Sequence, residues 1–400
     1  MSVPPRVAVT LTQLAHRVPG GSATSVLQLL DALGRTGEVD LVGVLAAGDL
    51  RRPSSLRGSS DLRGRGLPAP TAAGSTGAGS ADAGSADVGV PAGLATSTVP
   101  VPLPLLYDLW ARTGRPRVER STGPVDLVHV TVPMRVGVGT TPVVATVHDL
   151  FPLTRPQDSS ARGARLMAGG LEWIRDTARA VMVPSATVAA TCAEHGFDPA
   201  RVRVVPWGAS PGEPSSARVA EVLARHRLER PFVLFVGTME PRKNLSGLVE
   251  AMRQLDRPDV TLALVGPDGW GAAPDLASLA TPVARLGSVP SADLPALYAG
   301  ADVVALASLE EGFGLPVLEA MASGAAVVTS AGTATEDVAG DAALLVDPRA
   351  PEDLRDAIAS VLDEPDVGAR LRRAGVARAA QFDWERAATA TLDVYREVLG

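Results

Sequence analysis

Cysteine and long hydrophobic runs are scarce in this sequence of 400 residues, and each shortage excludes a class of protein. Cys192 is the single cysteine, which excludes an intramolecular disulfide and a cysteine-based metal site and fits a reducing compartment. No stretch approaches the roughly eighteen uncharged apolar residues that a membrane-spanning helix needs, and the chain starts with a short strand rather than a signal sequence. We therefore expect a cytoplasmic protein whose membrane contact is at most peripheral, on the cytoplasmic face.

The sequence also has no excess of basic residues. Its 37 lysine and arginine residues stand against 44 aspartate and glutamate residues, which gives a formal net charge of −7. Proteins that bind the phosphate backbone of nucleic acids need a basic face. We therefore expect no nucleic-acid partner, and an anionic ligand has to be bound by a local group of cations.

Lysine is the scarcest charged residue, since Lys243 is the only lysine beside thirty-six arginines. It belongs to the segment 237–244, Gly-Thr-Met-Glu-Pro-Arg-Lys-Asn, which lies between an apolar run at 232–236 and a helix-like segment at 245–252. Ligands of open α/β sheets bind outside the carboxyl ends of the strands, which places Arg242 and Lys243 at the mouth of a crevice. An ammonium suits a phosphate as a compact charge, and a neighbouring guanidinium can bind two oxygens at once.

A solvated basic turn is the alternative interpretation of this segment. Every other position of the chain that holds lysine or arginine holds arginine. A cation without a chemical role would therefore be expected to be arginine here as well. The choice of lysine at position 243 therefore favours a phosphate-binding role.

The chain divides into two halves in which short apolar strands alternate with helical segments. In the first half, strands are predicted at 6–11, 39–45, 125–130, 142–147, 180–183 and 202–205, with helices near 23–33 and 161–179. In the second half, strands are predicted at 232–236, 261–265, 283–286, 302–306, 325–329 and 343–346. This alternation predicts an α/β fold in which two parallel, helix-covered sheets face each other across a cleft.

Composition indicates the domain boundaries. Pro, Gly and Ser are concentrated near 210–216, which divides the chain into an N-terminal domain at 1–210 and a C-terminal domain at 211–385, followed by a final helix at 386–400. Residues 48–97 consist mainly of Gly, Ala, Ser, Pro and Asp, and they lack the large apolar side chains that would offset the entropy of ordering. We predict a long disordered insertion there, and a lid that orders over an acceptor is the alternative.

The strongest motif is the segment 310–324, Glu-Glu-Gly-Phe-Gly-Leu-Pro-Val-Leu-Glu-Ala-Met-Ala-Ser-Gly, which follows the predicted strand at 302–306. Its glycines leave backbone amides open at the start of a helix, where the helix dipole favours an anion such as a diphosphate. Glu311 in the loop and Glu319 one turn into the helix can both face one ligand. Because a diphosphate would repel carboxylates, sugar hydroxyls are the partners that we expect for them. The alternative is an acidic loop in which Glu319 stabilises the helix dipole.

These motifs resemble those of retaining glycosyltransferases of the GT-B fold, in the large family 4, or group 1, that includes sucrose synthase and bacterial mannosyltransferases. The acidic pair of that family, separated by seven residues, is matched by Glu311 and Glu319, and its basic diphosphate contacts are matched by Arg242 and Lys243. Many relatives carry an arginine directly after the strand glycine, where this chain has Thr238, so Arg242 would supply that charge. The resemblance covers nearly the whole chain apart from the insertion, and implies two Rossmann-like doubly wound domains, the first for the acceptor and the second for the donor.

Further segments are similar to that family. The segment Thr-Val-His-Asp-Leu at 146–150 resembles the histidine motif of the acceptor domain and implies that His148 contacts the transferred sugar, with a purely structural histidine as the alternative. The segment 382–386 resembles the crossing of the chain back to the N-terminal domain, and a helix packed on its own domain is the alternative. The catalytic residues implied are His148, Arg242, Lys243 and Glu311. The donor contacts implied are Gly20, Gly21, Arg242, Lys243, Gly287, Gly312, Phe313, Gly314, Leu315 and Glu319.

The resemblance implies the transfer of a hexose from a nucleotide diphosphosugar to an acceptor hydroxyl, with retention of the anomeric configuration. Arg242, Lys243 and the amides around Gly314 would stabilise the negative charge that develops on the departing diphosphate. Glu319 would bind the ribose, and Glu311 the hexose hydroxyls. No convincing Asp-x-Asp motif ends a strand, so we expect neither a metal nor another cofactor.

The donor and the acceptor are less well defined by the sequence. The combination of Pro-Arg-Lys-Asn, Gly-Pro-Asp-Gly-Trp and Thr-Val-His-Asp-Leu most resembles mannosyltransferases, and favours GDP-mannose over UDP- or dTDP-sugars as the donor. The acceptor is a glycan, a lipid or a small molecule, and the sequence does not discriminate among them. A sugar-nucleotide epimerase of the same fold and a catalytically silent sugar-nucleotide-binding subunit are the alternatives. A dinucleotide dehydrogenase is disfavoured, because no Gly-x-Gly-x-x-Gly follows the first strand.

Overall fold

The computed structural model describes residues 3–15, 20–48, 90–91, 93–158, 160–210, 212–271 and 274–400, which contain two parallel sheets. The strands of the N-terminal sheet are β1 Arg6–Thr10, β2 Asp40–Ala47, β3 Ala95–Pro102, β4 Leu127–Val130, β5 Val143–Thr146, β6 Ala180–Val183 and β7 Val202–Val204. The strands of the C-terminal sheet are β8 Phe232–Val236, β9 Thr261–Val265, β10 Val283–Gly287, β11 Val303–Leu306, β12 Val327–Ser330 and β13 Leu344–Val346.

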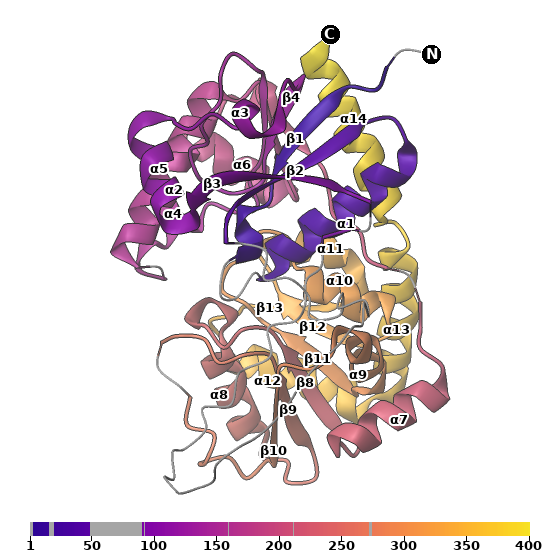
Figure 1. The fold of residues 1–400 in the computed structure, drawn as a ribbon. Coiled ribbons are helices and arrows are strands. Elements are labelled where there is room, and N and C mark those ends of the chain that lie inside the picture. The colour runs from indigo at the N-terminus through magenta and orange to yellow at the C-terminus, as the bar shows by residue number, and fades with distance from the viewer. Residues whose placement is uncertain are drawn as a thin grey trace, which may run out of the picture.

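Helices cover both sheets (Figure 1). The helices of the first half are α1 Gly20–Thr36, α2 Leu103–Thr113, α3 Glu119–Thr122, α4 Phe151–Thr154, α5 Ala161–Thr177 and α6 Ala186–Glu194. The helices of the second half are α7 Ser216–His226, α8 Leu245–Leu255, α9 Leu294–Gly300, α10 Leu315–Ala322, α11 Ala334–Ala339, α12 Pro351–Asp363, α13 Pro365–Ala379 and α14 Trp384–Leu399.

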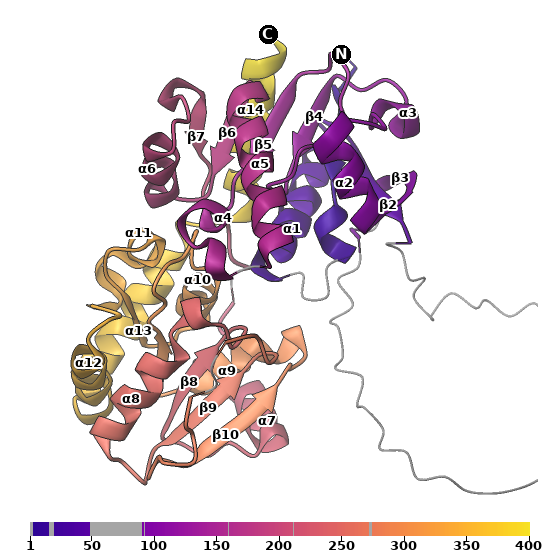
Figure 2. The same ribbon diagram turned by 90° about the vertical axis from the view of Figure 1, so that its left-hand side faces the viewer.

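Both sheets are doubly wound. The strand order is β3-β2-β1-β4-β5-β6-β7 in the first sheet and β10-β9-β8-β11-β12-β13 in the second. The order therefore reverses between β1 and β4 and again between β8 and β11, and such switch points are where open α/β sheets bind ligands. Figure 2 shows the N-terminal domain above the C-terminal domain, with α4 and α10 close to the boundary between them.

Central strands of both sheets are buried on both faces. Every residue of β4, β5, β8 and β11 is buried. The sequence of β8, Phe-Val-Leu-Phe-Val, is a continuous apolar run of the kind that a parallel sheet covered by helices requires. The predicted strand at 232–236 is confirmed residue by residue.

The edge strand β3 differs from the sequence prediction. It begins at Ala95, three residues inside the segment 48–97 that the composition predicts as a disordered insertion, and Ala95 pairs in parallel with Val42 of β2. That end of the prediction is wrong, because an edge strand needs no continuous apolar run and tolerates prolines. The remainder of the predicted insertion, at 49–89 and 92, lies outside the described residues.

The last helix, α14, lies beside α1 of the N-terminal domain, so the chain ends on that domain (Figure 1). Asp383 caps the start of α14 by accepting a hydrogen bond of 2.7 Å from the backbone N–H of Arg386. Near the end of α14, the Tyr395 hydroxyl lies 2.7 Å from Nδ1 of the buried His129 in β4. The contact of Tyr395 with His129 attaches the C-terminal helix to the N-terminal domain.

Hydrogen bonds also join the two domains near the boundary. Ser185 Oγ donates to the Gly312 carbonyl at 2.9 Å, and both the N–H and the hydroxyl of Thr187 donate to Asp337 Oδ2 at 2.9 Å. A Cβ on Gly312 would lie only 2.1 Å from the carbonyl oxygen of His148. Glycine at position 312 therefore allows the loop after β11 to approach the loop after β5.

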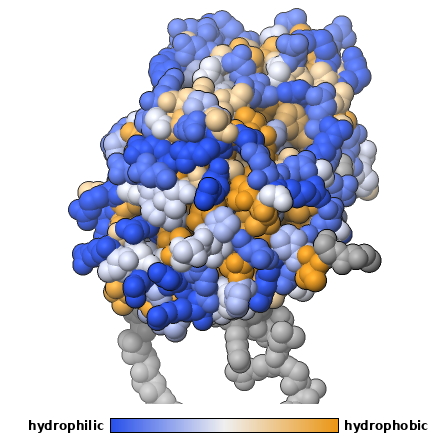
Figure 3. Space-filling view, turned by 90° about the horizontal axis from the view of Figure 1, so that it is seen from above, coloured by the Kyte–Doolittle hydropathy of each residue, from blue (hydrophilic) through white to orange (hydrophobic). Residues whose placement is uncertain are grey.

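Within the described residues, no helix combines the length and the apolarity that crossing a membrane requires. Figure 3 views the molecule from the side of the N-terminal domain, where a hydrophobic area near the centre is bordered by hydrophilic residues.

Candidate functional site

The candidate site lies at the switch point of the C-terminal sheet, where β8 and β11 pair side by side. After β8 the chain passes through Gly237 and a short 3-10 helix, Pro241–Lys243, before α8 begins at Leu245. After β11 a glycine-containing loop leads to α10, and the Leu309 N–H in this loop donates to the Arg242 carbonyl at 2.8 Å. The two loops are therefore joined through their backbones.

Arg242, Lys243 and Glu311 form one largely buried cluster. Lys243 Nζ lies 2.6 Å from Glu311 Oε1, and Arg242 Nη1 lies 2.9 Å from Glu311 Oε2. The Ser308 hydroxyl donates to Glu311 Oε1 at 2.8 Å, and Arg242 also pairs with Glu240. The structure thus brings together both predicted cations and one of the two predicted carboxylates.

The electrostatics of this cluster keep Glu311 ionised. Burial would raise the pKa of Glu311, but the Lys243 ammonium and the Arg242 guanidinium outweigh burial and lower the pKa to about 2. With Glu240 also paired to Arg242, two carboxylates balance two cations. A diphosphate that replaced or joined Glu311 as the anionic partner would find both cations already positioned.

The glycine loop shapes the start of α10. Gly314 has a φ of 100°, in the left-handed region, and a Cβ there would lie 2.7 Å from Thr335 Cγ2. The Phe313 and Leu315 side chains are buried, and the Phe313 ring centroid lies 5.2 Å from that of Trp207. These two residues can therefore offer a ligand their backbone groups, at a helix start where unpaired N–H groups favour an anion.

Glu319 in α10 makes a separate contact. The Tyr298 hydroxyl of α9 donates to Glu319 Oε2 at 3.3 Å. Burial raises the pKa of Glu319 to about 7, and the hydrogen bond from Tyr298 opposes this rise only in part. The carboxyl group is thus partly protonated near neutral pH and can exchange hydrogen bonds with hydroxyl groups.

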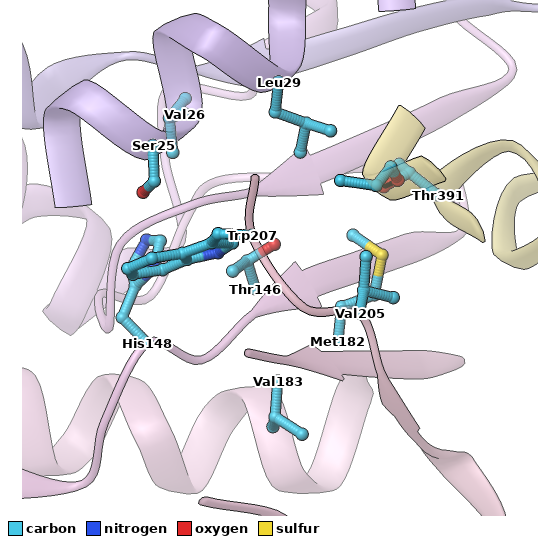
Figure 4. Close-up of a pocket in the computed structure, with 11 residues that line it drawn as sticks. Ser25, Val26, Leu29, Thr146, His148, Met182, Val183, Val205, Trp207 and Thr391 are labelled. Atoms are coloured by element: carbon cyan, nitrogen blue, oxygen red, sulfur yellow. Dashed lines mark hydrogen bonds between the residues drawn. The ribbon is translucent and has the colours of Figure 1, made fainter. Parts of the chain in front are cut away.

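His148 follows β5 in the N-terminal domain. Its Nε2 lies 3.1 Å from the Thr131 carbonyl, which assigns the ring proton to Nε2 and leaves Nδ1 as an acceptor. Nδ1 is buried and has no hydrogen-bond partner. Burial lowers the pKa of His148 to about 4, so the ring is neutral at pH 7. Figure 4 shows the ring lying against Trp207, with Ser25 nearby.

A cavity of about 250 Å³ is lined by residues of both domains next to these groups. His148, Asp149 and Phe151 line it from the N-terminal domain, and Arg242 lines it from the C-terminal domain. The Arg242 guanidinium carbon lies 4.5 Å from the centroid of the Phe151 ring. Burial raises the pKa of Asp149 to about 6, and the charge of Arg242 opposes this rise.

The other predicted donor contacts lie at the ends of elements. Gly20 and Gly21 are the first residues of α1. Gly287 ends β10 with a φ of 64°, and β9 separates β10 from β8. Gly287 therefore lies away from the cation cluster, in the edge strand of the same sheet.

Three residues of the site were not indicated by the sequence. The Trp207 ring lies 5.2 Å, between centroids, from both His148 and Phe313, and Phe151 and Tyr298 contact Arg242 and Glu319. Trp207 had one usable signal, because it closely follows β7 just as His148 follows β5. Phe151 and Tyr298 belong to no motif and are recognised only through contacts in space.

Two family models match this chain. The model described as "Glycosyltransferase Family 4" matches residues 19–213, and the model described as "Glycosyl transferases group 1" matches residues 223–378. The first match covers most of the N-terminal domain, and the second covers most of the C-terminal domain.

Curated relatives are similar to parts of the chain. The O-antigen chain mannosyltransferase B of Escherichia coli is 38% identical over 191 residues, which cover 46% of this chain and 50% of that protein. The D-inositol 3-phosphate glycosyltransferase of Salinispora arenicola is 32% identical over 327 residues, covering 71% of each chain. The chain spans about half the length of the first curated relatives that it matches, at 50%, 49% and 53%.

Solved structures share the fold. HepE of Anabaena, determined in complex with UDP and glucose, superposes with a TM-score of 0.71 at 18% identity, covering 98% of this chain and all of that one. WaaG, a glycosyltransferase involved in lipopolysaccharide biosynthesis, superposes with a TM-score of 0.70 at 17% identity, covering 97% and 99%. At such identities the likeness bears on the fold alone, and it confirms the predicted GT-B arrangement of two Rossmann-like domains.

Proposed function

Since this chain belongs to the glycosyl transferases of group 1, in glycosyltransferase family 4, we propose that it transfers a hexose from a nucleotide diphosphosugar to an acceptor hydroxyl with retention of configuration. The family predicted from the sequence is confirmed by the relative that is 32% identical over 71% of its length. The donor, the acceptor and the stereochemistry belong to the proposal.

The cluster of Arg242, Lys243 and Glu311 is the observation that carries the proposal. It places two cations and a carboxylate at the switch point, beside the glycine loop that opens α10. Transfer breaks the bond between the anomeric carbon and the diphosphate oxygen, and the two cations stabilise the charge that develops there. The acceptor oxygen bonds to the same face of the anomeric carbon, and its proton passes to the departing diphosphate.

The remaining residues have roles in orienting the donor. Nδ1 of His148 is an unpartnered acceptor that suits a hydroxyl of the hexose. Glu319, partly protonated and close to Tyr298, suits the two hydroxyls of the ribose. Both assignments extend the roles that the sequence resemblance implies.

We favour GDP-mannose as the donor. The Escherichia coli relative, at 38% identity, is named as a mannosyltransferase. The UDP in the Anabaena structure bears less on this chain, because that protein is only 18% identical.

The proposal is tested by incubating the protein with GDP-mannose, UDP-glucose and dTDP-glucose, each with and without candidate acceptors. We expect transfer from GDP-mannose only when an acceptor is present, and an α-linked product by NMR. Epimerisation of a donor without any acceptor would instead establish the epimerase. Binding without turnover across a broad acceptor panel would favour the catalytically silent subunit.

Turnover is expected to persist in EDTA. The sequence has no convincing Asp-x-Asp motif at a strand end, and Arg242 and Lys243 supply the positive charge at the diphosphate site. In the part of the chain that the structure describes, no group of three or more His, Cys, Asp or Glu side chains is arranged to hold a metal ion. Activity that disappears in EDTA and returns with Mg²⁺ or Mn²⁺ would contradict this prediction.

A cytoplasmic location with peripheral membrane contact is also part of the proposal. Flotation with liposomes of neutral and of anionic lipids tests the membrane contact directly. Failure to float with either kind would reject it without affecting the proposed transfer.

A further inference from the structure

The cavity between the domains bears on the chemistry of the acceptor, given the transferase function proposed above. Twelve of its fifteen lining residues belong to the N-terminal domain. Arg242 lines the cavity, whereas Lys243, Glu311 and Gly314 are not among its lining residues. The cavity therefore begins at Arg242 and extends from the proposed diphosphate site into the N-terminal domain, where the second substrate would be held.

Two buried polar atoms of the lining are hydrogen-bond acceptors that have no donor among the described residues. Gln13 Oε1 and His148 Nδ1 are both buried and have no hydrogen-bond partner. Asp149 adds a carboxyl group, one oxygen of which accepts a hydrogen bond of 3.1 Å from the Phe151 N–H. Buried acceptors in folded proteins are normally paired, so these groups fit the hydroxyl donors of a bound molecule. With His148 assigned to the transferred hexose, Gln13 and Asp149 remain for the acceptor.

The charged groups of the lining do not favour an anionic acceptor. Asp149, Asp158 and Glu240 all line the cavity, and Arg242 is the one cation among the described lining residues. Arg242 is already paired with Glu240 and Glu311. A phosphate monoester on the acceptor would bring further negative charge beside carboxyl groups, and the one cation of the described lining, Arg242, is assigned to the diphosphate of the donor.

Much of the remaining wall is apolar. Met134, Phe151, Pro152 and Met167 line the cavity, and Trp270 of the C-terminal domain completes it with 50% of its surface exposed. Aromatic rings offer large apolar contact areas, and methionine side chains adapt to irregular shapes. A half-exposed tryptophan beside a cavity thus offers a contact surface for an apolar part of a ligand.

We propose that the acceptor is an uncharged, hydroxyl-bearing molecule with an apolar group, as in an alkyl glycoside, and that phosphorylated sugars are poor acceptors. Hydroxyl groups of the acceptor bind Gln13 and Asp149, and its apolar group packs on Phe151, Met167 and Trp270. Transfer joins the acceptor oxygen to the anomeric carbon, breaks the bond from that carbon to the diphosphate, and delivers the hydroxyl proton to the diphosphate.

The test uses GDP-mannose as the donor and compares octyl α-mannoside, methyl α-mannoside and mannose 6-phosphate as acceptors. We expect the largest kcat/KM for the octyl glycoside, and a value for mannose 6-phosphate at least about tenfold below that for the methyl glycoside. A preference for mannose 6-phosphate, or transfer to none of the three while GDP-mannose binds in calorimetry, would overturn this inference. Failure of all three nucleotide sugars named above to bind would instead reject the proposed function.

Two variants and a matched control test whether this cavity is responsible. Trp270→Ala should raise the KM for octyl α-mannoside about tenfold and leave that for the methyl glycoside unchanged, because only the alkyl group loses its apolar contact. Asp149→Asn should narrow the difference in kcat/KM between methyl α-mannoside and mannose 6-phosphate, because it removes a negative charge. Leu345→Ala, at an exposed leucine of β13, should change neither quantity. The acceptor would have to bind elsewhere if Trp270→Ala changed the KM of both mannosides equally. The same conclusion would follow if Asp149→Asn left unchanged the ratio of kcat/KM between methyl α-mannoside and mannose 6-phosphate.

Discussion

Among the single residues of the site, Glu311 has a position that the sequence did not indicate. The sequence suggests contact with sugar hydroxyls, whereas in the structure both carboxylate oxygens are bound by Lys243 and Arg242. Burying two cations without an anion would be costly, so this carboxylate holds them in place before a donor arrives. Preorganised charge of this kind needs little rearrangement when the diphosphate departs.

Lys243→Ala should weaken the binding of GDP about ten- to a hundredfold, because a charge-assisted contact to phosphate contributes about 1.5–3 kcal/mol. Lys243→Arg should restore only part of that affinity, because the planar guanidinium does not replace a compact ammonium 2.6 Å from Glu311. Calorimetry with GDP measures both variants, and thermal unfolding controls for their folding. Full recovery in Lys243→Arg would show that a phosphate role does not explain the single lysine.

The two carboxylates of the motif should affect different kinetic constants. Glu319→Ala should raise the KM for the donor and weaken the binding of GDP, because Glu319 is expected to bind the ribose, far from the reacting bond. Glu311→Gln should lower kcat, because Lys243 and Arg242 lose the anion that holds them in place for the charge developing on the diphosphate. It should not weaken the binding of GDP, because the carboxylate of Glu311 competes with phosphate for the same two cations. Steady-state kinetics beside calorimetry separates the two effects. A Glu311→Gln variant that binds GDP as poorly as Glu319→Ala would refute this division of roles.

Among the helices and strands, β8 was predicted well and β3 was missed. Strand β8 was predicted to the residue because its apolar run is uninterrupted, whereas β3 was missed because it lies at an edge and is largely exposed. The Lys243–Glu311 pair joins residues 68 positions apart, so no local pattern could reveal it. The position of Phe151 against Arg242 depends on how the two domains meet, which strand and helix periodicity does not encode.

The attachment of α14 to the N-terminal domain can be tested through Tyr395. Tyr395→Phe leaves Nδ1 of the buried His129 without its partner, and should lower the free energy of unfolding by about 1–3 kcal/mol. Its neighbour Arg396 pairs with Glu38 at the surface, so Arg396→Ala is the matched control and should leave the stability close to that of the wild type. Urea unfolding at pH 7 compares the two variants. Equal stabilities would mean that the buried hydrogen bond does not contribute to attaching the helix.

Across the whole molecule, buried histidines and buried carboxyl groups have opposite effects on how the free energy of unfolding depends on pH. Burial lowers the pKa of His129 from 6.5 to about 3 and that of His148 from 6.5 to about 4, so these histidines favour unfolding as the pH falls below 6.5. Burial raises the pKa of Asp149 from 3.8 to about 6 and that of Glu319 from 4.5 to about 7. These carboxyl groups act in the opposite sense, because they favour unfolding as the pH rises through their folded-state pKa values.

The free energy of unfolding should therefore change little between pH 7 and pH 5 and then fall steeply below about pH 4.5. In the upper range, the unfolded chain gains protons on the two histidines while the folded chain gains them on Asp149 and Glu319, so the two effects nearly cancel. Below pH 4.5 the unfolded carboxyl groups are protonated as well, and the cancellation ends. Glu311, whose pKa is lowered from 4.5 to about 2, then adds to the loss because the unfolded chain binds its proton first.

Urea unfolding in steps from pH 7.5 to pH 3.5 measures this dependence. Each proton by which the unfolded state exceeds the folded state lowers the free energy of unfolding by about 1.4 kcal/mol per pH unit. Glu319→Gln removes one of the opposing carboxyl groups, so its stability should already decline between pH 7 and pH 5, where that of the wild type does not. The same decline in the wild-type protein, or its absence in Glu319→Gln, would show that the buried carboxyl groups do not offset the two histidines.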